Sequence, residues 1–94
     1  MTLSDMKEFL KVDDTADDAN ITALMTAAEA HIRGAVTNFM AYYGSDDDFT
    51  SLADTVEKLM VLELYDKPLA VVEANYSYPI RSMLAQLQYW KAAD

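Results

Sequence analysis

The chain has 94 residues, and its 16 Asp and Glu against seven Lys and Arg give a formal net charge of −9. This length predicts a single domain covering residues 1–94, and the acidic surplus opposes specific binding to nucleic acids or to anionic membranes. The absence of Cys excludes disulfides, thiolate catalysis and Cys-based zinc sites.

The composition also predicts the fold class and the compartment. Only two Gly and two Pro accompany many helix-forming residues, which predicts an all-α fold. The first residues lack the basic and apolar runs of a signal peptide, and no apolar stretch is long enough to span a bilayer. We therefore expect synthesis in the cytosol and no membrane partner.

The first expected helix begins after Thr2. Thr2 and Asp5 have the spacing of a capping box, in which each side chain bonds the other residue's backbone amide. Apolar residues then recur at helical spacing as far as Leu10. Asp13 and Asp14 interrupt this pattern and indicate a loop.

The second expected helix carries the longest apolar stripe in the sequence. It is expected to be capped at Thr15 and to end before Gly44, a residue suited to the left-handed conformation that follows many helices. About 28 helical residues would extend roughly 42 Å, beyond the diameter of about 32 Å for a compact domain of this size. The helix therefore either breaks near Gly34 or protrudes from the domain.

Two further helices and an arm complete the expected chain. An acidic loop at 45–48 precedes a third helix, which Ser51 is expected to cap and which Lys67 and Pro68 end. Residues 69–78 lack helical periodicity and are predicted to form an extended apolar arm. Pro79 begins the last helix. The prediction is a small bundle of about four helices, with one long central helix and an extended arm before the last helix. In this bundle Leu24, Ile32, Leu59 and Leu84 are expected to share one core.

The catalytic and metal-binding motifs are weak. His31 is the only histidine, and no partner is spaced to form a nucleophilic triad with it, so an enzyme would need a pocket that gathers Glu29, His31 and Glu63. No glycine-rich phosphate loop is present. We predict no catalytic residue, no cofactor and no enzyme activity.

One acidic register resembles a calcium loop. Its positions one, three, five, nine and twelve are Asp46, Asp48, Thr50, Asp54 and Glu57. Position six is Ser51 where the turn requires Gly, and the third helix is expected to begin beside it. We therefore predict no metal site.

Aromatic and apolar residues outside the helical stripes favour a protein-binding surface. Tyr and Trp suit positions where one end of the side chain is dry and the other wet, either at an interface or at the edge of the domain's own core. The interface candidates are Tyr42, Leu69, Val71, Val72, Tyr76, Tyr78, Tyr89 and Trp90.

The order of these features resembles a known family. The chain resembles the small head–tail connector proteins of long-tailed phages, which are associated with DNA packaging. Four segments carry the resemblance: the opening Leu3 to Asp13, the helix start from Asp18 to Ala28, the helix end from Leu62 to Pro68 and the Pro-led helix from Tyr78 to Leu87. The terminal segment Gln88 to Lys91 is more aromatic than the short basic end of that family.

The resemblance implies a structural role in the virion. It implies a homo-oligomeric ring at the head–tail junction, docked on the portal protein and contacting the next adaptor or tail protein, through which DNA passes without specific recognition. Before assembly the protein would lie in the host cytoplasm. The alternative hypothesis is a small acidic phage-encoded regulator or inhibitor that binds a host protein.

Overall fold

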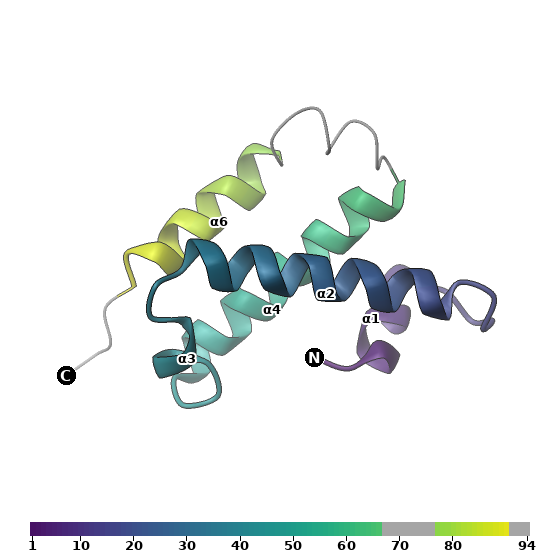
Figure 1. Ribbon diagram of the computed structural model, residues 1–94, viewed down its shortest axis with the longest axis horizontal. Helices are drawn as coiled ribbons and strands as arrows, with labels where there is room; N and C mark the ends of the chain where they lie inside the picture. Colours follow the sequence, from purple (N-terminus) through teal and green to yellow (C-terminus); the bar gives the residue numbers. More distant parts are fainter. Residues whose placement is uncertain (67–76, 91–94) are drawn as a thin grey trace.

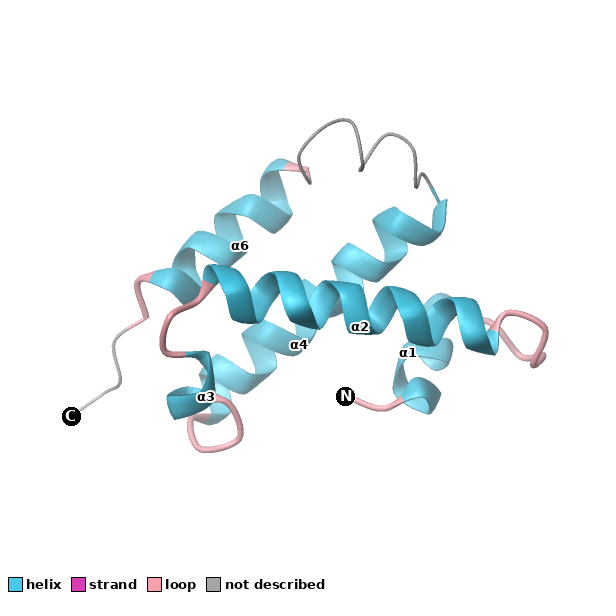
Figure 2. Cartoon of the chain, in the orientation of Figure 1, coloured by secondary structure: helices cyan, strands magenta, loops and turns pink. Residues whose placement is uncertain are grey.

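The computed structural model describes residues 1–66 and 77–90, and these residues form helices and loops without a strand. The helices are α1 (Leu3–Leu10), α2 (Asp18–Ala35), α3 (Phe39–Tyr42), α4 (Asp47–Asp66) and α6 (Tyr78–Gln88). The all-α prediction is confirmed. The central helix is α4, which packs against α1, α2 and α6 (Figures 1 and 2). Within the described ranges no helix has the length and apolarity that crossing a bilayer requires.

Helix α1 begins as the sequence predicts. The Asp5 amide donates to Thr2 Oγ1 at 3.1 Å, and the Thr2 amide donates to Asp5 Oδ2 at 3.3 Å, which completes the capping box. The helix ends at Leu10, and the next residue, Lys11, has a φ of 60° in the left-handed region. Hydrogen bonding of Asp5 to Thr2 holds the pKa of the Asp5 carboxyl below its usual value.

The predicted cap of α2 is wrong. The helix begins at Asp18 rather than after Thr15, and Asp17 occupies the cap position without a side-chain capping bond. The Asp17 carboxylate instead accepts a hydrogen bond of 2.6 Å from the Tyr65 hydroxyl of α4. A tertiary contact therefore uses the side chain that would otherwise cap the helix.

The single long helix predicted for this region is divided in two. Helix α2 ends at Ala35, Val36 adopts an extended conformation with φ −112° and ψ 104°, and α3 begins at Phe39. Of the two predicted alternatives, a break near Gly34 or a protruding helix end, the structure shows the break, which lies just beyond Gly34. Val36 is buried at this bend. Gly44 has the predicted left-handed conformation, with φ 85°.

The third helix was expected to start near Leu52, but α4 begins five residues earlier, at Asp47. The Phe49 amide donates to Asp46 Oδ1 at 3.0 Å, so Asp46 caps the helix and Ser51 lies inside it. Asp47 and Asp48 fall in the first turn, where the helix dipole favours acidic residues. The predicted acidic loop is thus largely the first turn of a helix.

Helix α6 begins with Pro79 in its first turn, as predicted. The Ser77 amide, just before the helix, donates to the Glu63 carboxylate at 3.3 Å. Tyr78 was predicted to end the extended arm and instead belongs to this helix. The rest of that predicted arm, residues 69–76, lies outside the described residues.

One apolar core joins the helices. Of the four predicted core residues, Ile32 and Leu84 are buried, and Leu24 and Leu59 are partly buried against the same cluster. The largest fully buried side chains come from α1, α2, α4, α6 and the bend after α2, and they are Phe49, Met6, Ile21, Ile32, Met60, Ile80, Leu87, Val36, Val56 and Val61.

Candidate functional site

An aromatic cluster closes one end of the bundle, where α3, the start of α4 and the end of α6 meet (Figure 1). Its centre is Phe49, which is fully buried. The Phe49 ring lies 5.9 Å from Phe39, 5.4 Å from Tyr42 and 5.7 Å from Trp90, measured between ring centroids. Phe39 also stacks on Tyr43 at 4.8 Å. The sequence analysis did not identify Phe49 as the centre of the core at this end.

Two of the predicted interface residues contribute to this cluster. Trp90 is half-buried, and its indole Nε1 donates to Asp46 Oδ2 at 3.0 Å. Tyr42 is half-buried against Phe49. Both side chains therefore pack within the chain and keep part of their surface exposed.

Two other predicted interface residues are strongly exposed. Tyr78 is 73% exposed at the start of α6, and Tyr89 is 81% exposed just after its end. The remaining candidates, Leu69, Val71, Val72 and Tyr76, lie outside the described residues. Met40 on α3 is 78% exposed and was not among the predicted interface residues, which outside residues 69–72 were chosen from Tyr and Trp alone.

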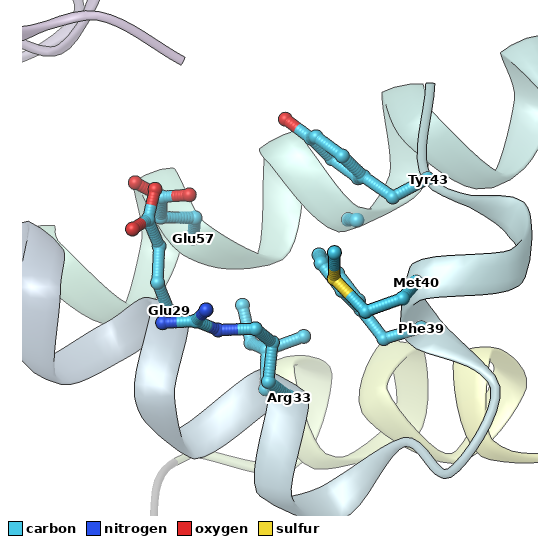
Figure 3. Close-up of a pocket in the computed structure, with 8 residues that line it drawn as sticks. Glu29, Arg33, Phe39, Met40, Tyr43 and Glu57 are labelled. Atoms are coloured by element: carbon cyan, nitrogen blue, oxygen red, sulfur yellow. The ribbon is translucent and has the colours of Figure 1, made fainter. Parts of the chain in front are cut away.

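A pocket of about 190 Å³ lies between α2, α3 and α4. Its lining residues are Glu29, Ile32, Arg33, Phe39, Met40, Tyr43, Ala53 and Glu57. Figure 3 shows the carboxyl groups of Glu29 and Glu57 together on one side, toward which the Arg33 guanidinium also points, with Phe39, Met40 and Tyr43 on the other. The pocket thus combines a charged side, with two acids and one base, and an apolar and aromatic side.

Glu57 is the buried acid of this pocket. Its side chain comes from the core-facing side of α4 and is 4% exposed, and its Oε2 atom has no hydrogen-bond partner among the described residues. Burial, and then the nearby Glu29 carboxylate, raise the pKa of Glu57 to about 7. Glu57 therefore changes its charge near neutral pH.

A second acid stands close to Glu57 in a different environment. Asp54 Oδ1 accepts a hydrogen bond of 2.6 Å from the Tyr43 hydroxyl. Burial of the Tyr43 phenol and this bond to Asp54 raise the pKa of Tyr43, so the phenol stays protonated at neutral pH. The bond ties the residue after α3 to α4 beside the pocket.

Glu29, His31 and Glu63, the three residues considered for an enzyme site, line no common pocket described among residues 1–66 and 77–90. Glu29 lines the pocket between α2, α3 and α4, whereas Glu63 lines a separate depression beside Ser77 and Pro79. His31 lies on the exposed side of α2 and is not among the residues that line the Glu29 pocket.

The calcium-like register is likewise not arranged as a loop. All of its residues after Asp46 lie within α4, and both carboxylate oxygens of Asp46 accept hydrogen bonds, from the Phe49 amide and the Trp90 indole. Within residues 1–66 and 77–90, no group of three or more His, Cys, Asp or Glu is placed to hold a metal ion.

The described residues form a small helical protein that exposes large apolar and aromatic side chains at Met40, Tyr78 and Tyr89. The family model described as phage gp6-like head-tail connector protein matches residues 1–84. The chain belongs to this family and is a structural connector protein of a phage. No curated protein and no solved structure matches the chain.

Proposed function

We propose that the chain is a ring-forming subunit of the connector between the phage head and tail. In this proposal copies of the chain assemble on the portal protein, contact the next adaptor or tail protein, and let DNA pass without recognising its sequence. The family match over residues 1–84 is the observation that carries the proposal. The protein would be located at the head–tail junction of the virion, and in the host cytoplasm before assembly.

The exposed aromatic residues support ring assembly. Tyr78 begins α6 and Tyr89 follows its last residue, so two exposed aromatic side chains lie at opposite ends of one helix. A closed ring of identical subunits needs two different surfaces on each subunit, one for each neighbour. We propose that these two ends contribute to the two surfaces, together with the exposed part of Tyr42 and Trp90 and the apolar residues Leu69, Val71, Val72 and Tyr76.

The net charge supports passage of DNA without tight binding. A net charge of −9 repels the phosphate backbone, so DNA inside such a ring would slide rather than adhere. The proposed role needs no cofactor, metal or catalytic residue.

Self-association tests the ring proposal. Sedimentation velocity at rising concentration should show a ring-sized species for the wild-type chain, whereas a regulator or inhibitor would stay a monomer or dimer. Tyr78→Asp should abolish the ring, because a charge in a dry interface is costly. The same variant should preserve the melting temperature of the dilute monomer, because an acid in the first turn of α6 suits the helix dipole.

Asn20→Asp is the matched control, since it adds the same charge at an exposed position near the start of α2. It should leave the ring intact. Equal ring formation by the Tyr78→Asp variant and the wild type would remove Tyr78 from the interface. A chain that stays monomeric at every concentration, with and without portal protein, would overturn the ring proposal.

A further inference from the structure

We propose that the pocket between α2, α3 and α4 binds an arginine side chain of a partner protein, with Glu57 and Glu29 pairing its guanidinium group. This inference concerns a site on the single subunit, so it stands or falls independently of ring formation.

The first support is the state of Glu57. Glu57 is 4% exposed and one of its carboxyl oxygens has no hydrogen-bond partner in the described part of the chain, so its ionised form is costly unless a cation or donor reaches it. The free-energy cost of removing a charge from water is offset when a partner supplies the opposite charge and additional hydrogen bonds. An incoming cation would meet this need.

The second support is the shape and chemistry of the pocket. Two carboxyl groups lie on one side, toward which the Arg33 guanidinium also points, and the stacked rings of Phe39 and Tyr43, 4.8 Å apart, lie on the other with Met40 (Figure 3). A guanidinium is planar, donates several parallel hydrogen bonds to carboxylates and packs its flat face on aromatic rings. These features fit arginine better than lysine, whose ammonium is a compact and strongly hydrated charge.

The third support is the exposure of the rim. Met40 is 78% exposed beside the pocket, which gives a partner an apolar surface next to the acidic one. A partner could therefore bury Met40 and place a charged side chain in the pocket at the same time. Such a combination of an apolar contact and a desolvated charge pair is typical of the strongest positions in protein interfaces.

Charge complementarity favours a different protein over a second copy of this chain as the donor. The chain contains two arginines, Arg33 and Arg81, and Arg33 already stands at the rim of its own pocket. A second copy could therefore offer only Arg81 to this pocket. A partner that presents an arginine on a neutral or basic surface complements the two acids of the pocket better.

The charged and titratable groups around Glu57 set how binding depends on pH. They are Glu29 and Arg33 from α2, Tyr43 after α3, Asp54 from α4 and the Met1 amino group. Glu57 has a pKa of about 7 in the free subunit and would lose its proton when it pairs with arginine. Binding should therefore be about tenfold weaker at pH 6 than at pH 8.

The test uses N-acetyl-arginine amide as the probe and the isotopically labelled full chain. Carbon-13 signals of the Glu57 carboxyl and the Met40 methyl should shift and saturate together, with a Kd on the order of millimolar at pH 8. The neutral analogue N-acetyl-citrulline amide should cause no saturable shift. Glu57→Gln and Glu29→Gln should each weaken binding at least about fivefold, and Arg33→Gln should strengthen it by removing a like charge from the rim.

The matched control is Glu8→Gln, an exposed acid on α1 whose loss should change the Kd by less than about twofold. Shifts spread over many surface acids, equal binding of the citrulline analogue, or a Glu57→Gln variant that is folded and binds as tightly as the wild type would each overturn the site. Self-association that Glu57→Gln and Arg81→Gln weaken equally would identify a second copy as the occupant and overturn the assignment to a different protein.

Discussion

At the scale of single residues, Glu57 is a buried acid on the core face of a helix that the sequence analysis did not recognise. It lies at helical spacing from Ala53, Val56 and Met60, all of which are buried, so the face of α4 that carries it is the core face. The sequence presents Glu57 as the last position of a calcium register, and that register does not exist because the segment is helical. The position of Glu57 on an apolar stripe was the signal that could have identified it as a buried acid.

Replacing Glu57 with Gln should stabilise the protein at alkaline pH. The pKa of Glu57 is raised to about 7 in the folded chain, so the native state holds a proton that the unfolded state releases at lower pH. The stability that Glu57 contributes is complete below the unfolded pKa and is lost as the pH rises through 7. At pH 8 the variant should gain on the order of 1–3 kcal/mol in unfolding free energy, because an amide replaces an ionised buried group.

Urea unfolding at pH 5 and pH 8 measures this effect. The wild type should lose stability between the two values, and Glu57→Gln should lose much less. Glu8→Gln, which changes an exposed acid, should follow the wild type. A Glu57→Gln variant with the same pH dependence as the wild type would show that Glu57 is ionised at little cost in the folded chain.

At the scale of helices, sequence patterns located the elements better than their ends. The capping box at Thr2 and the Pro-led start of α6 were predictable because each depends on residues within one turn. The starts of α2 and α4 were not, because they depend on contacts distant in sequence. Asp17 accepts a hydrogen bond from Tyr65, and Asp46 caps α4 and also accepts a hydrogen bond from the Trp90 indole. Rules based on neighbouring residues alone therefore could not identify which acid or hydroxyl residue precedes each helix.

The division of the predicted long helix has the same origin. The length estimate showed that the helix had to break or protrude, but the position of the break depends on what is buried after it. Ending α2 at Ala35 buries Val36 and brings Phe39 and Tyr42 onto Phe49, which lies in the next helix. The same nonlocal contacts explain why Phe49 could not be identified as the centre of the aromatic cluster.

Removing the cap of α4 should destabilise the whole end of the bundle that holds the aromatic cluster. In Asp46→Ala the Phe49 amide and the Trp90 indole both lose their acceptor, so the melting temperature should fall by about 5 °C or more. Asp48→Ala removes the same charge from an exposed position in the first turn of the same helix and should have a smaller effect. Thermal melting followed by Trp90 fluorescence compares the two variants. An equal fall in melting temperature for both would show that Asp46 acts through its charge alone.

At the scale of the whole molecule, the chain combines a self-contained apolar core with several exposed surfaces suited to other proteins. The core explains why a short acidic chain folds, since α4 is covered by α1, α2 and α6 and buries its apolar face on all of them. The exposed Met40, Tyr78 and Tyr89 lie on or beside three different helix ends, and they take little part in that core. The chain belongs to the head-tail connector family, and we propose that these exposed residues serve assembly with other phage proteins.

The sedimentation of the chain with the portal protein of the same phage tests the central claim most directly. A connector subunit should sediment as a ring-sized species bound to the portal, and Tyr78→Asp should remain a free monomer of unchanged melting temperature while Asn20→Asp assembles normally. A wild-type chain that remains a monomer or dimer in the presence of portal protein, across the full range of accessible concentrations, would contradict the account.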